Sequence, residues 1–138
     1  MPVTTADVGL VAALTAASRR LHSHMHTAVS PEGLTVEQWS VLDHVARTPA
    51  AVAMSAVAEA SGLTGPSLTR AVDKLVTSAL MFREVDAGDR RRVLVKLSKR
   101  GAEVHARLAP RVEAAEHQLA GSPSAAGELI EMLGGLAR

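Results

Sequence analysis

The sequence has no cysteine and almost no aromatic residues. Without cysteine, the 138-residue chain has no disulfide, no thiolate ligand for a metal and no thiol nucleophile. Trp39 and Phe82 are its only aromatic residues, so the core must consist of alanine, leucine and valine, which pack well between helices. No run of about 18 apolar residues could span a bilayer, and the N-terminus has no signal-peptide pattern. We therefore expect a soluble, cytoplasmic protein.

Charge is distributed unevenly along the chain. The length suits a single domain over residues 1–138, and 47% apolar residues are enough for a core. The net charge is only +1, but residues 64–101 contain nine basic and four acidic residues, whereas both flanking segments are mildly acidic. A basic middle segment indicates a polyanionic partner. An ordinary solvated charged surface is the alternative.

Apolar spacing and capping residues predict a mainly helical fold. A long amphipathic helix is expected over residues 5–29, and Thr35 with Gln38 forms a capping box for a second helix that ends before Thr48-Pro49. A short third helix covers Met54 to Ser61 and ends at Gly62, and Thr64 can cap a fourth. Ser98 and Ser122 are expected to cap the last two helices. The fourth helix has its buried stripe at Leu68, Val72, Leu75 and Ala79.

The periodicity changes between residues 81 and 97. Met81 to Val85 and Val93 to Leu97 favour strands, and Asp86 to Asp89 supplies the turn of a β-hairpin. Helix, helix, helix and hairpin in this order predict a winged helix-turn-helix over residues 34–101. The apolar faces of residues 5–29 and 102–137 exceed what this part can cover, so we expect them to form a homodimer that reads a pseudo-palindrome.

The turn of the hairpin contains three adjacent arginines, Arg90, Arg91 and Arg92, after Asp89. Guanidinium groups at an exposed turn repel one another, so this arrangement favours a polyanion such as double-stranded DNA as the partner. Solubility of the turn is the simpler explanation, but it needs neither three charges nor the aspartate. Arg70 and Lys74 lie one helical turn apart on the face opposite Leu68, where DNA contacts must arise.

Three stretches of the sequence together resemble the MarR family of bacterial transcription regulators. They are residues 34–39 (LTVEQW), residues 67–75 (SLTRAVDKL) and residues 89–101 (DRRRVLVKLSKRG), of which the last is similar to the wing signature of the family. The resemblance extends over essentially the whole chain. It implies a homodimeric DNA-binding regulator, usually a repressor, that a small phenolic or other ligand releases from its operator.

The resemblance also implies roles for individual residues. Ser67, Thr69, Arg70 and Lys74 match the DNA-facing positions of the recognition helix, while Asp89 and Arg91 match the wing pair in which the aspartate orients the arginine for the minor groove. Ala79 departs from the family pattern, which usually has glycine there. Alanine can end a helix without a positive φ, so we expect at most a longer last turn.

The histidines and Trp39 are candidates for an effector site. His22 and His26 are spaced four residues apart on one helix, which suits a shared zinc ion, and His44, His105 and His117 lie on helices expected to be nearby. No cysteine completes a zinc set, so we favour a polar lining of a ligand pocket formed by His22, His26, Trp39 and His44. Trp39 can also be a core residue. We expect a small aromatic acid as the ligand, and a zinc-responsive regulator is the alternative.

Two other classes of function fit the sequence less well. An enzyme would need a phosphate loop, a nucleophile or a paired acid site, and none is visible, so we expect no catalytic residues, no metal and no cofactor. A winged fold used only for protein contacts would favour a neutral wing. A DNA-binding regulator therefore remains the leading hypothesis.

Overall fold

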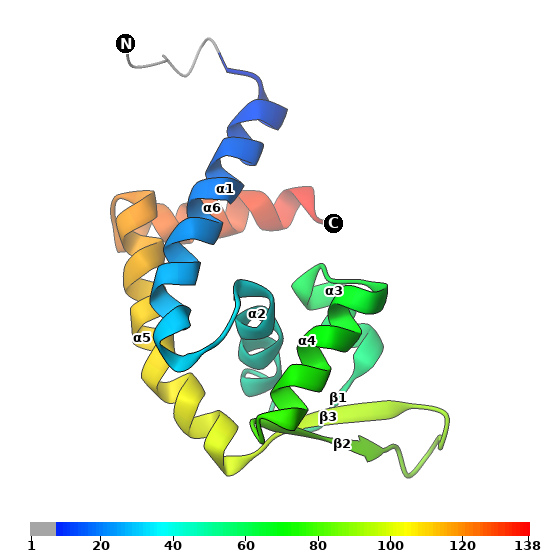
Figure 1. Ribbon diagram of the computed structural model, residues 1–138. Helices are drawn as coiled ribbons and strands as arrows, with labels where there is room; N and C mark the ends of the chain where they lie inside the picture. Colours follow the sequence, from blue (N-terminus) through cyan, green and yellow to red (C-terminus); the bar gives the residue numbers. More distant parts are fainter. Residues whose placement is uncertain (1–7) are drawn as a thin grey trace.

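The computed structural model describes residues 8–138 and consists of helices around a small sheet (Figure 1). Within these residues, none of the helices has the length and apolar character that a membrane span requires. In chain order the elements are α1 (Leu10–Val29), the 3-10 helix η2 (Ser30–Glu32), α2 (Val36–Ala46), β1 (Val52–Ala53), α3 (Met54–Ser61), α4 (Gly65–Thr77), β2 (Met81–Val85), β3 (Val93–Leu97), α5 (Lys99–Ala120) and α6 (Pro123–Leu136).

A single apolar core lies between the helices and one face of the sheet. Its members come from α1, α2, α3, α4, α5 and all three strands. Leucine and valine dominate it as expected, whereas alanine supplies one buried member, Ala71, and otherwise packs around it partly buried. Leu42, Leu75 and Leu108 are fully buried at its centre. The hairpin β2–β3 extends beyond the helices on one side, whereas the first turns of α1 and helix α6 lie at the opposite end of the molecule (Figure 1).

Most helix ends are where the capping residues predict them. Thr35 and Gln38 form the expected capping box, in which the Thr35 oxygen accepts the N–H of Gln38 and the Gln38 side chain accepts the N–H of Thr35, both at 3.1 Å. Ser98 and Ser122 also accept the expected backbone N–H groups. Thr64 occupies the cap position of α4, but its side chain makes no capping hydrogen bond. The first helix begins at Leu10, later than expected, and residues 5–7 lie outside the described part.

The sheet has one strand more than the expected hairpin. Strands β2 and β3 have the predicted bounds and pair from Met81 with Leu97 to Val85 with Val93. Strand β1 pairs with the other edge of β3, placing Val52 opposite Val95. This two-residue strand is too short for a periodic signal in the sequence. It ties the segment before α3 to the base of the hairpin.

The end of α4 contradicts the expectation for Ala79. This residue has φ +60°, in the left-handed region, and it is exposed rather than part of the buried stripe. The N–H of Ala79 donates to Val76 O at 3.0 Å and the N–H of Leu80 donates to Leu75 O at 2.9 Å. These two bonds form a Schellman motif, which requires a left-handed residue at the Ala79 position. The fold therefore imposes a positive φ on a residue that has a Cβ atom.

The start of α5 is fixed to the end of α4. The Ser98 hydroxyl donates to Ala79 O at 2.6 Å and accepts from the N–H of Gly101 at 2.9 Å, while the N–H of Ser98 donates to Leu80 O at 3.0 Å. A Cβ atom on Gly101 would lie 1.9 Å from Leu80 O, so only glycine fits there. We call these four residues the α4–α5 junction. The hairpin begins and ends at this junction.

Candidate DNA-binding surface and effector pocket

Helix α4 has one buried face and one exposed polar face. Leu68, Val72 and Leu75 hold the helix on the core, which leaves the opposite face to solvent. All four residues expected to face DNA on this helix are exposed: Ser67, Thr69, Arg70 and Lys74. The Thr69 hydroxyl donates to Gly65 O at 3.2 Å, so it can still accept a hydrogen bond from a ligand.

An ion pair connects α4 with the hairpin. Asp73 on the exposed side of α4 binds Arg83 of β2. Asp73 therefore orients Arg83 of the hairpin rather than a neighbour on its own helix. Arg70 and Lys74 flank Asp73 in the sequence, and neither of them is its partner in the described residues.

The tip of the hairpin orders its arginines through two aspartates. Asp89 accepts hydrogen bonds from the backbone N–H of Arg91 at 3.0 Å and from its Nε at 3.3 Å. Arg92 lies 3.6 Å from Asp86, whose other oxygen accepts the N–H of Gly88. The Arg91 side chain is 93% exposed, so the Asp89 contact contributes little to stability. Its effect is to fix the direction in which the guanidinium points.

A cavity of about 400 Å³ lies between α1 and α2, with further lining from α3 and α5. Three of the four candidate effector residues, His22, Trp39 and His44, line it, together with apolar side chains of Leu21, Met25 and Val36. His26 does not line this cavity and is exposed elsewhere on α1. The structure therefore brings together three of the four residues, and the pairing of His22 with His26 does not contribute to the site.

Trp39 forms one end of an aromatic and ionic cluster at the cavity. The His105 ring from α5 stacks on the Trp39 ring, with centroids 5.1 Å apart and planes within 4° of parallel. His105 Nε2 lies 2.8 Å from Asp43 Oδ1, and Asp43 Oδ2 accepts from Arg47 Nε at 2.9 Å. The sequence placed His105 near the other histidines but gave no indication of its stacking on Trp39.

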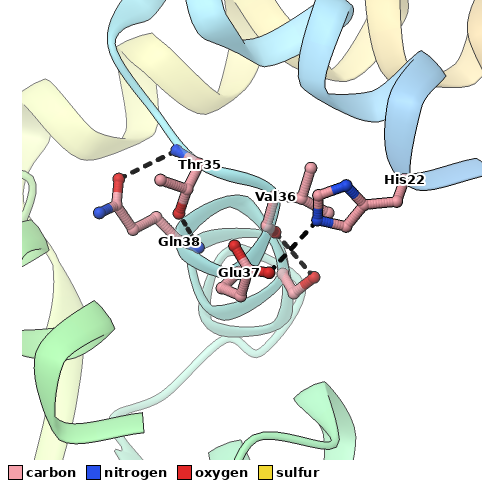
Figure 2. A network of polar contacts seen from close by, with 6 residues as sticks. His22, Thr35, Val36, Glu37 and Gln38 are labelled. Atoms are coloured by element: carbon pink, nitrogen blue, oxygen red, sulfur yellow. Dashed lines mark hydrogen bonds and ion pairs between the residues drawn. The ribbon is translucent and has the colours of Figure 1, made fainter. Parts of the chain in front are cut away.

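His22 is bound to a carboxylate at the edge of the cavity. Its Nε2 lies 3.3 Å from Oε1 of Glu37, in the first turn of α2 (Figure 2). A backbone hydrogen bond at this helix start lowers the pKa of Glu37, and the His22 contact lowers it further. Figure 2 shows the imidazole on α1 directed toward Glu37, beside the Thr35–Gln38 capping box.

Glu116 of α5 is a cavity residue that the sequence did not single out. Burial raises the pKa of its carboxyl group, and the nearby Asp43 raises it further, while Arg47 acts in the opposite direction. On the sequence alone, Glu116 is one of several acidic residues along α5, including Glu113. Its position in the cavity depends on how α5 packs across α2.

No group of three or more histidine, aspartate or glutamate side chains in residues 8–138 is arranged to hold a metal ion. In the described residues His22 forms an ion pair with Glu37. The geometry of the described residues thus gives no support to the zinc alternative.

The comparison with known proteins covers both the sequence and the fold. Residues 32–92 match the sequence model of the MarR family. The structure is similar to that of NadR in complex with 4-hydroxyphenylacetate, with a TM-score of 0.82 and 21% identity over 100% of this chain and 99% of NadR. Similarity to BpsR from Bordetella bronchiseptica gives a TM-score of 0.82 and 21% identity over 99% and 98% of the two chains.

A third similar structure is a mutant of MarR from E. coli complexed with operator DNA. It has a TM-score of 0.79 and 21% identity, and the match covers 99% of each chain. The fold is therefore that of a winged helix-turn-helix protein with additional long helices. Residues 32–92, which contain most of the winged helix, match the MarR family, and the chain as a whole shares the fold of these similar structures.

Proposed function

We propose that this protein is a transcriptional regulator of the MarR family, a homodimeric repressor that binds a pseudo-palindromic operator and is released by a small aromatic ligand. The observation that carries this proposal is the wing tip, where Asp89 holds the 93% exposed Arg91 away from the rest of the protein. A pre-oriented arginine on a hairpin suits the narrow minor groove, while Arg70 and Lys74 on α4 suit the adjacent major groove. We expect it to act in the cytoplasm, without catalysis or cofactor.

Each of the candidate DNA-binding residues has a defined task in this proposal. Base edges would be read from α4, and its hydroxyl groups and Lys74 would contact phosphates. The wing would contribute mainly through charge and groove width. The eight residues concerned are Ser67, Thr69, Arg70, Lys74, Asp89, Arg90, Arg91 and Arg92.

The proposal of a homodimer rests on apolar surface at the end of the molecule away from the sheet. Large apolar side chains of α1 and α6 are exposed in the single chain, among them Leu10, Val11, Ile130, Met132 and Leu136. Exposed apolar surface of this extent typically marks an interaction site. A second copy would cover it and set the separation of two recognition helices at about 34 Å, one turn of DNA.

The proposal of a ligand rests on the cavity next to these helices. An aromatic molecule fits the apolar walls, and polar contacts would come from His22 and His44. Two of the similar structures support this class: one is NadR in complex with 4-hydroxyphenylacetate, and the other describes regulation of DNA binding of BpsR by 6-hydroxynicotinic acid. The sequence alone suggested a phenolic or carboxylic aromatic ligand. A ligand that stabilises a separation of the two recognition helices other than the one that DNA requires would lower the affinity for DNA.

DNA binding can be tested by fluorescence anisotropy on a duplex from the region upstream of the protein's own gene. We expect affinity to fall steeply with salt, at about −0.9 log units per log unit of salt for each phosphate neutralised. Arg91→Ala should weaken binding and reduce this slope. Arg138→Ala, at the far end of the chain, removes an equal charge as a control and should change neither. A flat salt response of the wild type would refute the proposal.

A further inference from the structure

Two carboxylates line the cavity, Asp43 and Glu116, and they differ in their hydrogen-bond partners within the protein. Asp43 has both oxygens occupied, one by His105 at 2.8 Å and the other by Arg47 at 2.9 Å. It is therefore compensated within the protein and has little capacity left for a ligand. The Arg47 guanidinium is likewise engaged with Asp43, although its side chain is 74% exposed.

The second carboxylate, Glu116, is half-buried in the cavity and has no hydrogen bond or ion pair with any of residues 8–138. Its surroundings disfavour the ionised form, since burial and then Asp43 raise its pKa. The carboxyl oxygens of Glu116 reach solvent, since none of the fully buried polar side-chain atoms in the described residues lacks a partner, and a ligand that supplies a donor would replace water there.

Two of the three basic side chains that line the cavity already bind a carboxylate of the protein. His22 is engaged by Glu37 at 3.3 Å and Arg47 by Asp43, which leaves His44 as the lining histidine without a carboxylate partner among the described residues. A ligand carboxylate placed beside Glu116 would therefore meet a second negative charge with little compensation.

Resting on the proposed effector role of this cavity, we propose that Glu116 determines which ligands it accepts. Glu116 favours aromatic molecules that present a hydrogen-bond donor, an ammonium group or a phenolic hydroxyl, and it disfavours those that present a carboxylate. The aromatic ring lies against the apolar wall formed by Leu21, Met25 and Val36. The donor end points to Glu116. Of the phenolic and carboxylic ligands expected from the sequence and the family resemblance, this proposal keeps the phenolic class, adds amines and departs from the expected aromatic acid.

The proposal can be tested by isothermal titration of the DNA-free protein with three probes of similar size: phenylethylamine, para-cresol and phenylacetate. Glu116→Gln keeps the shape of the side chain and removes its charge. Glu113→Gln is the matched control, because Glu113 lies on the same helix, is 67% exposed and does not line the cavity. A direct binding measurement does not depend on DNA affinity.

We expect the wild type to bind phenylethylamine and para-cresol more tightly than phenylacetate. Glu116→Gln should weaken phenylethylamine about tenfold or more, as for the loss of a charge-assisted hydrogen bond, and weaken para-cresol less because an acceptor oxygen remains. Phenylacetate should bind more tightly to this variant. Glu113→Gln should behave as the wild type.

Three results would overturn this inference. One is a preference of the wild type for phenylacetate, which would indicate that His44 or Arg47 sets the selectivity. Another is an equal effect of Glu113→Gln and Glu116→Gln. The third is that no probe binds. If salt-sensitive DNA binding persists in that case, the DNA-binding part of the proposed function stands and only the ligand site is wrong.

Discussion

Replacement of Ala79 by glycine should stabilise this protein, although glycine usually weakens secondary structure. The Ala79 backbone has φ +60°, and its N–H and that of Leu80 close the Schellman motif at the end of α4. A left-handed conformation costs a residue with a Cβ atom about 1–2 kcal/mol. Glycine avoids this cost, but it also raises the conformational entropy of the unfolded chain, which lowers the free energy of unfolding by about 0.4–1 kcal/mol. The net gain should be about 0.5–1 kcal/mol.

Urea denaturation at a fixed protein concentration measures this difference, because association would otherwise shift the midpoint. The gain corresponds to a rise in melting temperature of about 2–4 °C for a chain of this size. Ala106→Gly provides the matched control, since Ala106 is exposed in the middle of α5. The same chemical change should there destabilise the protein by about 0.5–1 kcal/mol. Two variants that lose stability equally would refute the argument.

Four further substitutions test other parts of the structure. Gly101→Ala should destabilise the fold by about 1–3 kcal/mol in urea melts, since its Cβ would lie 1.9 Å from Leu80 O, and an unchanged midpoint would contradict the close packing. Because the pKa of Glu116 is raised in the folded state, the wild type loses stability as the pH rises above the ordinary value of 4.5. Glu116→Gln should therefore be as stable as the wild type in acid and more stable than the wild type toward neutral pH. Thermal melts at several pH values measure this difference. Arg91→Ala should weaken binding to all duplexes similarly, whereas Arg70→Ala should also reduce discrimination between bases by about 1–3 kcal/mol. Fluorescence anisotropy with operator and random DNA measures both effects. Equal losses of affinity in the two variants on both duplexes would contradict the assignment.

The sequence predicted most of the secondary structure because local signals determine it. The Thr35–Gln38 box and the serines before α5 and α6 fix helix starts through contacts within three residues, and the hairpin strands have a clear alternation. Strand β1 has no such signal. Its two residues become a strand only because β3, about forty positions later, supplies the partner.

The error at Ala79 has a different origin. A preference for glycine at a left-handed position is worth only about 1–2 kcal/mol, and the need to turn directly from α4 into β2 outweighs it. The residue-type rule was sound, but a tertiary requirement of the fold prevailed. The place of Ala79 between α4 and β2, and not its residue type, therefore determines its conformation.

The pocket was the least predictable part. Trp39, His22 and His44 stood out as rare residue types, and they do line one cavity. Glu116 did not stand out, because acidic residues on a helix look alike until packing buries one of them. His26 was included through its spacing from His22, yet only His22 of the two lines the cavity, because α1 packs on both α2 and α5 and its turns have different neighbours.

The α4–α5 junction has a consequence for how the wing can vary. The chain leaves the junction at Leu80 and returns to it at Ser98, where the two backbones are bonded directly at 3.0 Å. The segment between is the hairpin β2–β3, whose ends are already held together, so extra residues at its tip would change neither end. The tip of the wing, residues 86–92, can therefore be lengthened or exchanged, while Met81 and Val95 keep the base of the hairpin in the core and α4 keeps its packing on α2. Ser98 and Gly101 are then the residues that any exchanged wing must keep next to it.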